Sequence, residues 1–300
     1  MAAIKEYQMT IFHQDSNPTE IDKLFERTII GIDIPPCPII LNKFMAEAAK
    51  EDPNYALMAG IVEADVAISA SLIKTANSPF FGIRQRVRSV KEALAILGMT
   101  TASRAIAGII LRNTFPTIPN MERFWDASTR IARLSGWLAQ YYKLPGLLAE
   151  DAYTFGLFRD CGIPVLLKRY PHYNTVLAKA NQDVERGFID VEEAELPTNH
   201  AILGCILAQS WWLPEDIFMA IRHHHDLSAL NNDRYELSIL SRNLIATSQL
   251  AEHIVQHQLG LSLTQEWSKL GHICLRLMGI NKYQLEELYA VVESIVITED

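Results

Sequence analysis

The stretch MERFWDASTRIARLSGWLAQYY (residues 121–142) decides the fold class of this chain. Its apolar residues recur at intervals of three and four, which is the spacing of one face of an amphipathic helix. The stripe consists of Phe124, Ala127, Ile131, Leu134, Leu138 and Tyr141. We therefore expect a long helix here, with this stripe turned toward a protein core.

Helical periodicity continues in both directions from this stretch. Gly98 is expected to end one helix, because glycine is favoured just past the last helical residue. On the N-terminal side, helices are expected at 18–30, 39–50, 51–65, 66–78, 89–98 and 101–113. On the C-terminal side, they are expected at about 147–159, 164–169, 171–186, 190–196, 199–211, 214–224, 233–258 and 281–296. Since no run reads convincingly as a strand, the chain is predicted to be an all-α, multi-helical globule.

Prolines mark the expected boundaries. Residues 1–18 are expected to form a flexible arm, and DIPPCP (33–38) a rigid extended connector. TFPTIPN (114–120) holds two prolines and is the best internal boundary. The prediction is an N-terminal helical lobe, a second helical lobe and a set of C-terminal helices, at 19–115, 120–226 and 227–300. The C-terminal helices either complete the second lobe or form an interface in a homodimer.

Composition excludes several classes of protein. Apolar residues make up 49% of the chain and the net charge is −8, which argues against general nucleic-acid binding. Charged residues interrupt the N-terminus where a signal peptide needs an apolar core, and no stretch is expected to span a membrane. The four cysteines form no CxxC pair and are predicted to be core residues: Cys37, Cys161, Cys205 and Cys274. A cytoplasmic location is therefore expected.

Several motifs in order carry a family resemblance. They are IPPCPIILNKF, VEADVAISASLIKTANSPFFG, RVRSVKEALAILGM, FWDAS, AYTFGLFRDCG, NHAILGCILAQSWWLP and IFMAIRHHHD. The series resembles the HDOD family, a degenerate relative of the HD-type metal phosphohydrolases, and it covers roughly residues 25–226. The resemblance implies an HDOD domain at 19–226 whose second lobe is HD-like. It also implies a bacterial signalling or regulatory protein.

The resemblance also implies where the metal ligands of an HD hydrolase would lie. Such an enzyme holds divalent metal with a His, an adjacent His-Asp pair and a later Asp. In this chain Ala127 stands at the first position, Arg159 and Asp160 at the pair, and Thr247 at the last. Only Asp160 retains a ligand atom, so the site is expected to be degenerate.

Arg159 cannot be a metal ligand, because a guanidinium is always charged and only donates hydrogen bonds. We expect it to take the place of the metal as a fixed positive charge, paired with Asp160 or with a nearby carboxylate such as Glu150 or Asp151. Two interpretations remain open: a buried structural ion pair, or an arginine that grips a phosphate or carboxylate of a signal molecule.

The histidines leave a second question open. His200 lies in the first turn of a predicted helix and faces inward, while the candidates His223, His224 and His225 lie at the C-terminal end of another. Three interpretations remain open: the rings are hydrogen-bonded residues of the core or of a helix end, they line an anion pocket with Arg159, or they bind zinc or iron. In the metal-bound alternative the ligands would be Asp160, His200 and His224.

Three arginines alternate between two predicted helices, Arg84, Arg86 and Arg88. They either contact a nucleotide or acidic partner, or they belong to a solvated loop that packs its aliphatic stems on neighbouring aromatic rings.

The leading hypothesis is a non-catalytic signal-transduction module. It would bind a protein partner or a small anionic signal molecule in a degenerate HD crevice, with no cofactor. The alternatives are a divergent metal-dependent phosphohydrolase, which would use Asp160 and the histidines with a divalent metal, and a purely structural scaffold. Ala127 and Arg159 discriminate between the first two, because an enzyme would need another ligand in their place.

Overall fold

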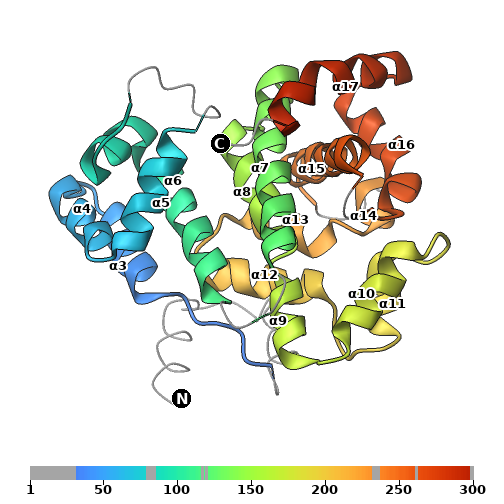
Figure 1. The fold of residues 1–300 in the computed structure, drawn as a ribbon, viewed down its shortest axis with the longest axis horizontal. Helices are drawn as coiled ribbons and strands as arrows, with labels where there is room; N and C mark the ends of the chain where they lie inside the picture. The colour runs from blue at the N-terminus through green and yellow to red at the C-terminus, as the bar shows by residue number, and fades with distance from the viewer. Residues whose placement is uncertain are drawn as a thin grey trace. The chain divides into compact units, whose positions relative to one another are not determined.

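The described part of the chain consists of α-helices joined by turns and loops (Figure 1). The computed structural model describes residues 32–78, 86–115, 118, 121–231, 237–260 and 263–297, with side chains described to residue 292. Within these residues there is no strand, which confirms the all-α prediction. The expected arm at 1–18 and helix at 18–30 lie outside the described residues.

Four helices form the N-terminal part of the fold. They are α3 (Ile39–Ala48), α4 (Tyr55–Glu63), α5 (Val66–Ala76) and α6 (Val90–Thr114). Gly98 lies inside α6 with φ of +71°, and this left-handed residue divides it into two helical segments, as the sequence predicts.

One described helix, α6, is long and apolar enough to cross a membrane by length and composition. The left-handed Gly98 divides it into segments that are each shorter than the roughly 20 residues of a spanning helix. Half of its apolar window is buried inside the protein. We therefore describe α6 as a core helix.

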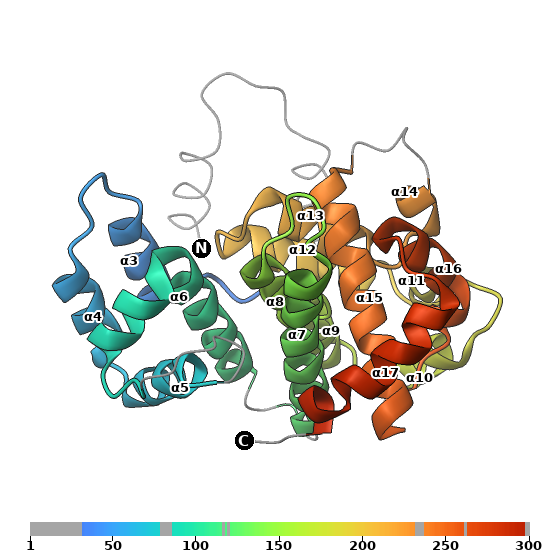
Figure 2. The same ribbon diagram turned by 90° about the horizontal axis from the view of Figure 1, so that it is seen from above.

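The centre of the fold is α7 (Glu122–Tyr142), which packs against α8 (Ala149–Phe158) and α15 (Ile239–Leu259) (Figure 2). The expected stripe of α7 is buried at its middle positions, but Ala127 is half-buried and Tyr141 is exposed. Because helices pack on two sides of α7, the buried face is wider than the stripe. It consists of Trp125, Ser128, Ile131, Ala132, Leu134, Ser135, Gly136, Leu138 and Ala139.

The remaining helices surround this centre. They are α9 (Gly162–Arg169), α10 (Tyr173–Gln182), α11 (Phe188–Glu193), α12 (His200–Ser210), α13 (Glu215–His223), α14 (Leu227–Asn231), α16 (Glu266–Met278) and α17 (Lys282–Ile297). Residues 34–300 form one unit by their contacts, and the proposed division at 114–120 stays a prediction.

The helix expected at 233–258 begins later than predicted, at Ile239, because the Ser238 hydroxyl caps it by accepting from the Ser241 amide. The sequence did not predict two of the helices, α14 and α16. In α16 a central Gly271 weakens the helical signal, although the Trp267 ring packs over it in the structure.

A close approach of α9 to α12 positions the site. A Cβ atom on Gly162 would lie 2.0 Å from the carbonyl oxygen of His200 and 2.8 Å from the amide nitrogen of Gly204. Only glycine fits against this backbone, since real Cβ contacts are never so short. The contact holds the turn at Asp160, two residues before Gly162, beside the start of α12.

The Gly162→Ala variant should therefore lose stability, by about 2 kcal/mol or more in the free energy of unfolding, because rigid backbone must move. The matched control is Gly60→Ala in α4, where a Cβ would meet nothing within 4 Å and which should gain up to about 1 kcal/mol. Urea unfolding measures both. Equal stability of the two variants would contradict the close approach.

Candidate functional site

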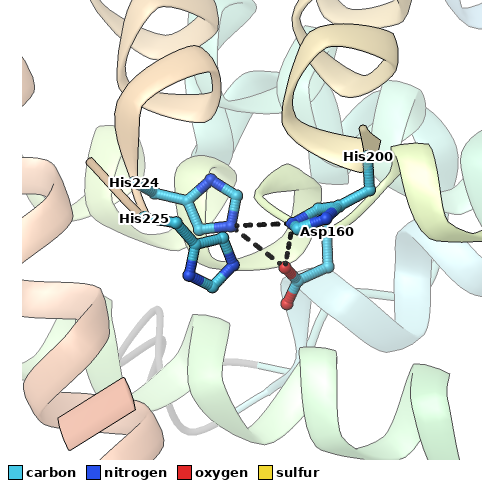
Figure 3. A group of neighbouring side chains, drawn as sticks. All are labelled: Asp160, His200, His224 and His225. Atoms are coloured by element: carbon cyan, nitrogen blue, oxygen red, sulfur yellow. Dashed lines mark hydrogen bonds and ion pairs between the residues drawn. The ribbon is translucent and has the colours of Figure 1, made fainter. Parts of the chain in front are cut away.

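Asp160 and three histidines converge in the interior of the protein (Figure 3). Asp160 lies in the turn between α8 and α9, His200 begins α12, and His224 and His225 follow α13. One ligand atom from each residue lies within 4.8 Å of the others. The histidines are 0%, 1% and 7% exposed, so the cluster is largely withdrawn from solvent.

Each histidine is held through its Nδ1 atom by an oxygen that only accepts hydrogen bonds. The contacts are His200 to Glu192 Oε2 at 2.7 Å, His224 to the carbonyl of Ile221 at 2.7 Å, and His225 to Glu266 Oε2 at 2.6 Å. Nδ1 must therefore donate in all three rings, and in the neutral ring Nε2 carries a lone pair. This arrangement, with a carboxylate or carbonyl behind the ring, is typical of metal-ligating histidines.

The Nε2 atoms of His200 and His224 lie 3.3 Å apart, at 3.7 and 3.2 Å from Oδ1 of Asp160 (Figure 3). Three acceptors this close need a cation or a proton between them. Burial and the neighbouring His225 lower the pKa of His224 to about 3, so this ring is neutral. Burial also disfavours a charged His200, but Glu192 and Asp160 outweigh it and raise the pKa of His200. A proton on His200 Nε2 can thus satisfy the cluster without a metal.

Arg159 is buried beside this cluster, with 3% of its surface exposed. Its Nε donates to Oδ2 of Asp160 at 2.9 Å, and its Nη2 donates to Oε2 of Glu252 on α15 at 2.6 Å. Burial opposes ionisation of Asp160, but Arg159 with His224 and His200 holds its pKa well below the usual value. Asp160 therefore turns one oxygen to the guanidinium and the other to the histidines.

The expectation of a carboxylate partner for Arg159 holds for Asp160, but Glu150 and Asp151 were the wrong alternatives. The carboxylate of Asp151 instead pairs with Arg104 at 2.5 Å. α8 faces α6 at this position, so its first-turn acid meets a cation from that helix.

The structure brings together five of the six candidate residues, Arg159, Asp160, His200, His224 and His225. His223 is the exception, because its Nδ1 lies 3.5 Å from Oδ2 of Asp226 and away from the cluster. This adjacent histidine is therefore a natural control for the others.

The two other positions implied by the HD resemblance bring no histidine or carboxylate. Ala127 is a half-buried residue of α7, and Thr247 is buried in α15. The neighbours of Thr247 do reach the site: Ser248 accepts from Nη1 of Arg159 at 3.4 Å, and Gln249 donates to the carbonyl of His224 at 3.4 Å.

Sequence reasoning missed the three acids that hold the centre, Glu192, Glu252 and Glu266. Each is buried, at 0%, 9% and 2% exposure. Glu252 is an isolated acid in a helix with buried neighbours, whereas Glu192 lies in a run of acids and Glu266 begins its helix. Their partners lie 8, 93 and 41 residues away, and periodicity does not reveal such pairs.

Comparison with known proteins identifies the family of the chain. The HDOD domain profile matches residues 34–227. An uncharacterized protein of Treponema pallidum (strain Nichols) is 27% identical over 201 residues, which is 65% of this chain and 38% of that protein. The chain thus matches well under half of that relative's length.

Two crystal structures share the fold. One from Shewanella amazonensis SB2B, named "Putative phosphohydrolase", has a TM-score of 0.66 at 21% identity, covering 92% of this chain and 94% of that one. An HDOD domain protein with unknown function from Geobacter sulfurreducens has a TM-score of 0.63 at the same identity and coverage.

The chain has an all-α fold with a buried centre of histidine and aspartate side chains. Because the HDOD profile covers more than half of its residues, the chain belongs to the HDOD family.

Replacing Arg159 by methionine should cost about 3 to 5 kcal/mol of unfolding free energy, because Asp160 and Glu252 would be left as buried charges without a cation. The double variant Arg159→Met with Glu252→Met should recover part of this loss. The control is Lys179→Met, which breaks the exposed Lys179–Glu195 pair and should cost less than about 1 kcal/mol. Chemical denaturation gives all three values, and an Arg159 loss as small as the control would refute the buried pair.

Proposed function

We propose that this chain is a non-catalytic signal-transduction module, which binds a protein partner or a small anionic signal at its degenerate HD centre. The observation that carries the proposal is the buried Arg159, salt-bridged to Asp160 and Glu252 where an HD hydrolase needs a histidine ligand. A fixed cation at this position supplies the positive charge that a metal would otherwise bring. Asp160, whose side chain is 18% exposed, is the edge of the centre that a binding molecule can reach.

The guanidinium also offsets the negative charge of the carboxylates that metal-dependent hydrolysis requires. One oxygen of Asp160 and the carboxylate of Glu252 are engaged with Arg159. A phosphoryl-transfer centre with two metals needs several carboxylates to hold and bridge them. Here a cation would find one carboxylate oxygen and three imidazole nitrogens, with a positive guanidinium next to them.

The second candidate function, metal-dependent phosphohydrolysis, is favoured by the converging Nε2 atoms. Asp160, His200, His224 and His225 would hold one divalent ion, which would supply a Lewis acid and an activated water. Four protein ligands fill a tetrahedral shell, whereas a catalytic zinc site has three ligands and an open position. With zinc, the donor set therefore fits a closed site better than a catalytic one.

Hydrolysis of bis(4-nitrophenyl) phosphate, measured with added Mn²⁺, Fe²⁺ or Zn²⁺, tests the proposal. The native chain should be no faster than the His224→Gln variant, which removes a ring from the cluster. His223→Gln is the matched control, because it removes the adjacent ring that faces Asp226. Activity that is retained in the His223 variant and abolished in the His224 variant would establish the enzyme and overturn the non-catalytic module.

A further inference from the structure

A second site lies away from the histidine cluster, in a cavity of about 1730 Å³. Its walls come from α5, α6, α7 and α8, together with the residues that precede α6. None of Asp160, His200, His224 and His225 lines it. Ligand pockets commonly measure about 300–1,000 Å³, so this cavity has room for a molecule larger than a simple anion.

The lining is strongly basic. Among the residues that the structure describes, six cationic side chains and one carboxylate line the cavity, and that carboxylate, of Asp126, accepts from Arg130 at 2.9 Å. The cations are Lys74, Arg86, Arg88, Arg112, Arg130 and Arg133. The whole chain has a net charge of −8, so the positive charge of the lining is opposite in sign to that of the chain. Like charges in one cavity repel one another, and they focus a field that attracts a small anion.

The same cavity is lined by aromatic rings. Trp125, Trp137 and Tyr153 contribute to its walls. Trp137 is held by stacking on Tyr141, with ring centroids 4.8 Å apart and an interplanar angle of 19°. Burial raises the pKa of Tyr153, and the positive charge of Arg133 opposes this shift. Rings and guanidinium groups stack on planar bases.

Neutral donors complete the lining, from the amides of Asn113 and Gln140, and Asn77 also lines the cavity. Asn77 is fixed, because its side chain donates to the carbonyls of Ile73 and Val87 and accepts from the Val87 amide. This anchoring holds the C-terminal end of α5 against the segment that carries Arg86 and Arg88. Those two arginines thus have a defined place in the wall, while Arg84 lies outside the described residues.

We propose that this cavity binds a small nucleotide, with its phosphates on the arginines and its base against the aromatic rings. Arginine matches phosphate through paired N–H groups, and the mixture of cations and rings is what a base with phosphates requires. A nucleic-acid strand is the less favoured ligand. It would extend beyond the cavity, and the chain as a whole carries a net charge of −8.

Titration of the full chain with ADP, pyrophosphate, adenosine and a single-stranded oligothymidine tests this proposal, with calorimetry as the readout. ADP should bind, pyrophosphate should bind more weakly, and adenosine should not bind detectably. The variant Arg88→Glu with Arg112→Glu changes two exposed lining residues and should weaken ADP binding by about tenfold or more. The control Lys43→Glu with Lys282→Glu makes the same charge change outside the cavity and should shift affinity by less than about twofold.

Three results would overturn the site: no binding of ADP, an equal loss of affinity in the control, or oligothymidine binding tighter than ADP. The last result would indicate a nucleic-acid surface. If the arginine variant fails to fold, Lys74→Glu at an exposed position of α5 replaces it, with the same expected loss.

Discussion

The buried ion pairs of Arg159 are the interaction on which the centre of this protein depends. One guanidinium joins Asp160, in the turn after α8, to Glu252, in the middle of α15. Taking three charges out of water is costly, and only their mutual hydrogen bonds offset the cost. The arginine therefore ties two distant segments of the chain together, and its positive charge opposes the cost of burying both carboxylates.

The histidines follow from the same arrangement. Because Arg159 occupies one oxygen of Asp160, only Oδ1 remains for the rings of His200 and His224. Behind the rings, Glu192 and Glu266 fix the orientation of His200 and His225. The phenol of Tyr173 donates in turn to Glu192. Such layered hydrogen bonding is typical of metal sites, yet here a proton on His200 and the guanidinium of Arg159 bring positive charge to Asp160 without a metal.

Local sequence patterns predict most of the helices and part of the site. Apolar periodicity identified α7 and α12, and Gly98 marked the break in α6. The inward position of His200 also followed from its helix, and the family resemblance singled out Arg159 and Asp160. These features depend on residues within one or two helical turns of one another.

What the sequence does not predict depends on contacts between distant segments. Glu252 lies 93 residues from Arg159, and nothing in either helix indicates their pairing. The buried face of α7 is wider than its apolar stripe, because α8 and α15 cover it on two sides. The basic cavity likewise combines α5, α6 and α7, so Arg112 and Arg130 meet Arg86 and Arg88 only in the folded chain.

The most direct test of this account is the ¹⁵N NMR spectrum of the histidine rings, which reports the tautomer and charge of each imidazole. At pH 6, below the usual histidine pKa, the account predicts a cationic His200 and a neutral His224 protonated on Nδ1. The proton on Nε2 of His200 then lies where a metal would, and Arg159 supplies the permanent positive charge of the centre. Neutral rings at His200, His224 and His225 with metal-shifted Nε2 signals would contradict the account, because the centre would then be a metal site.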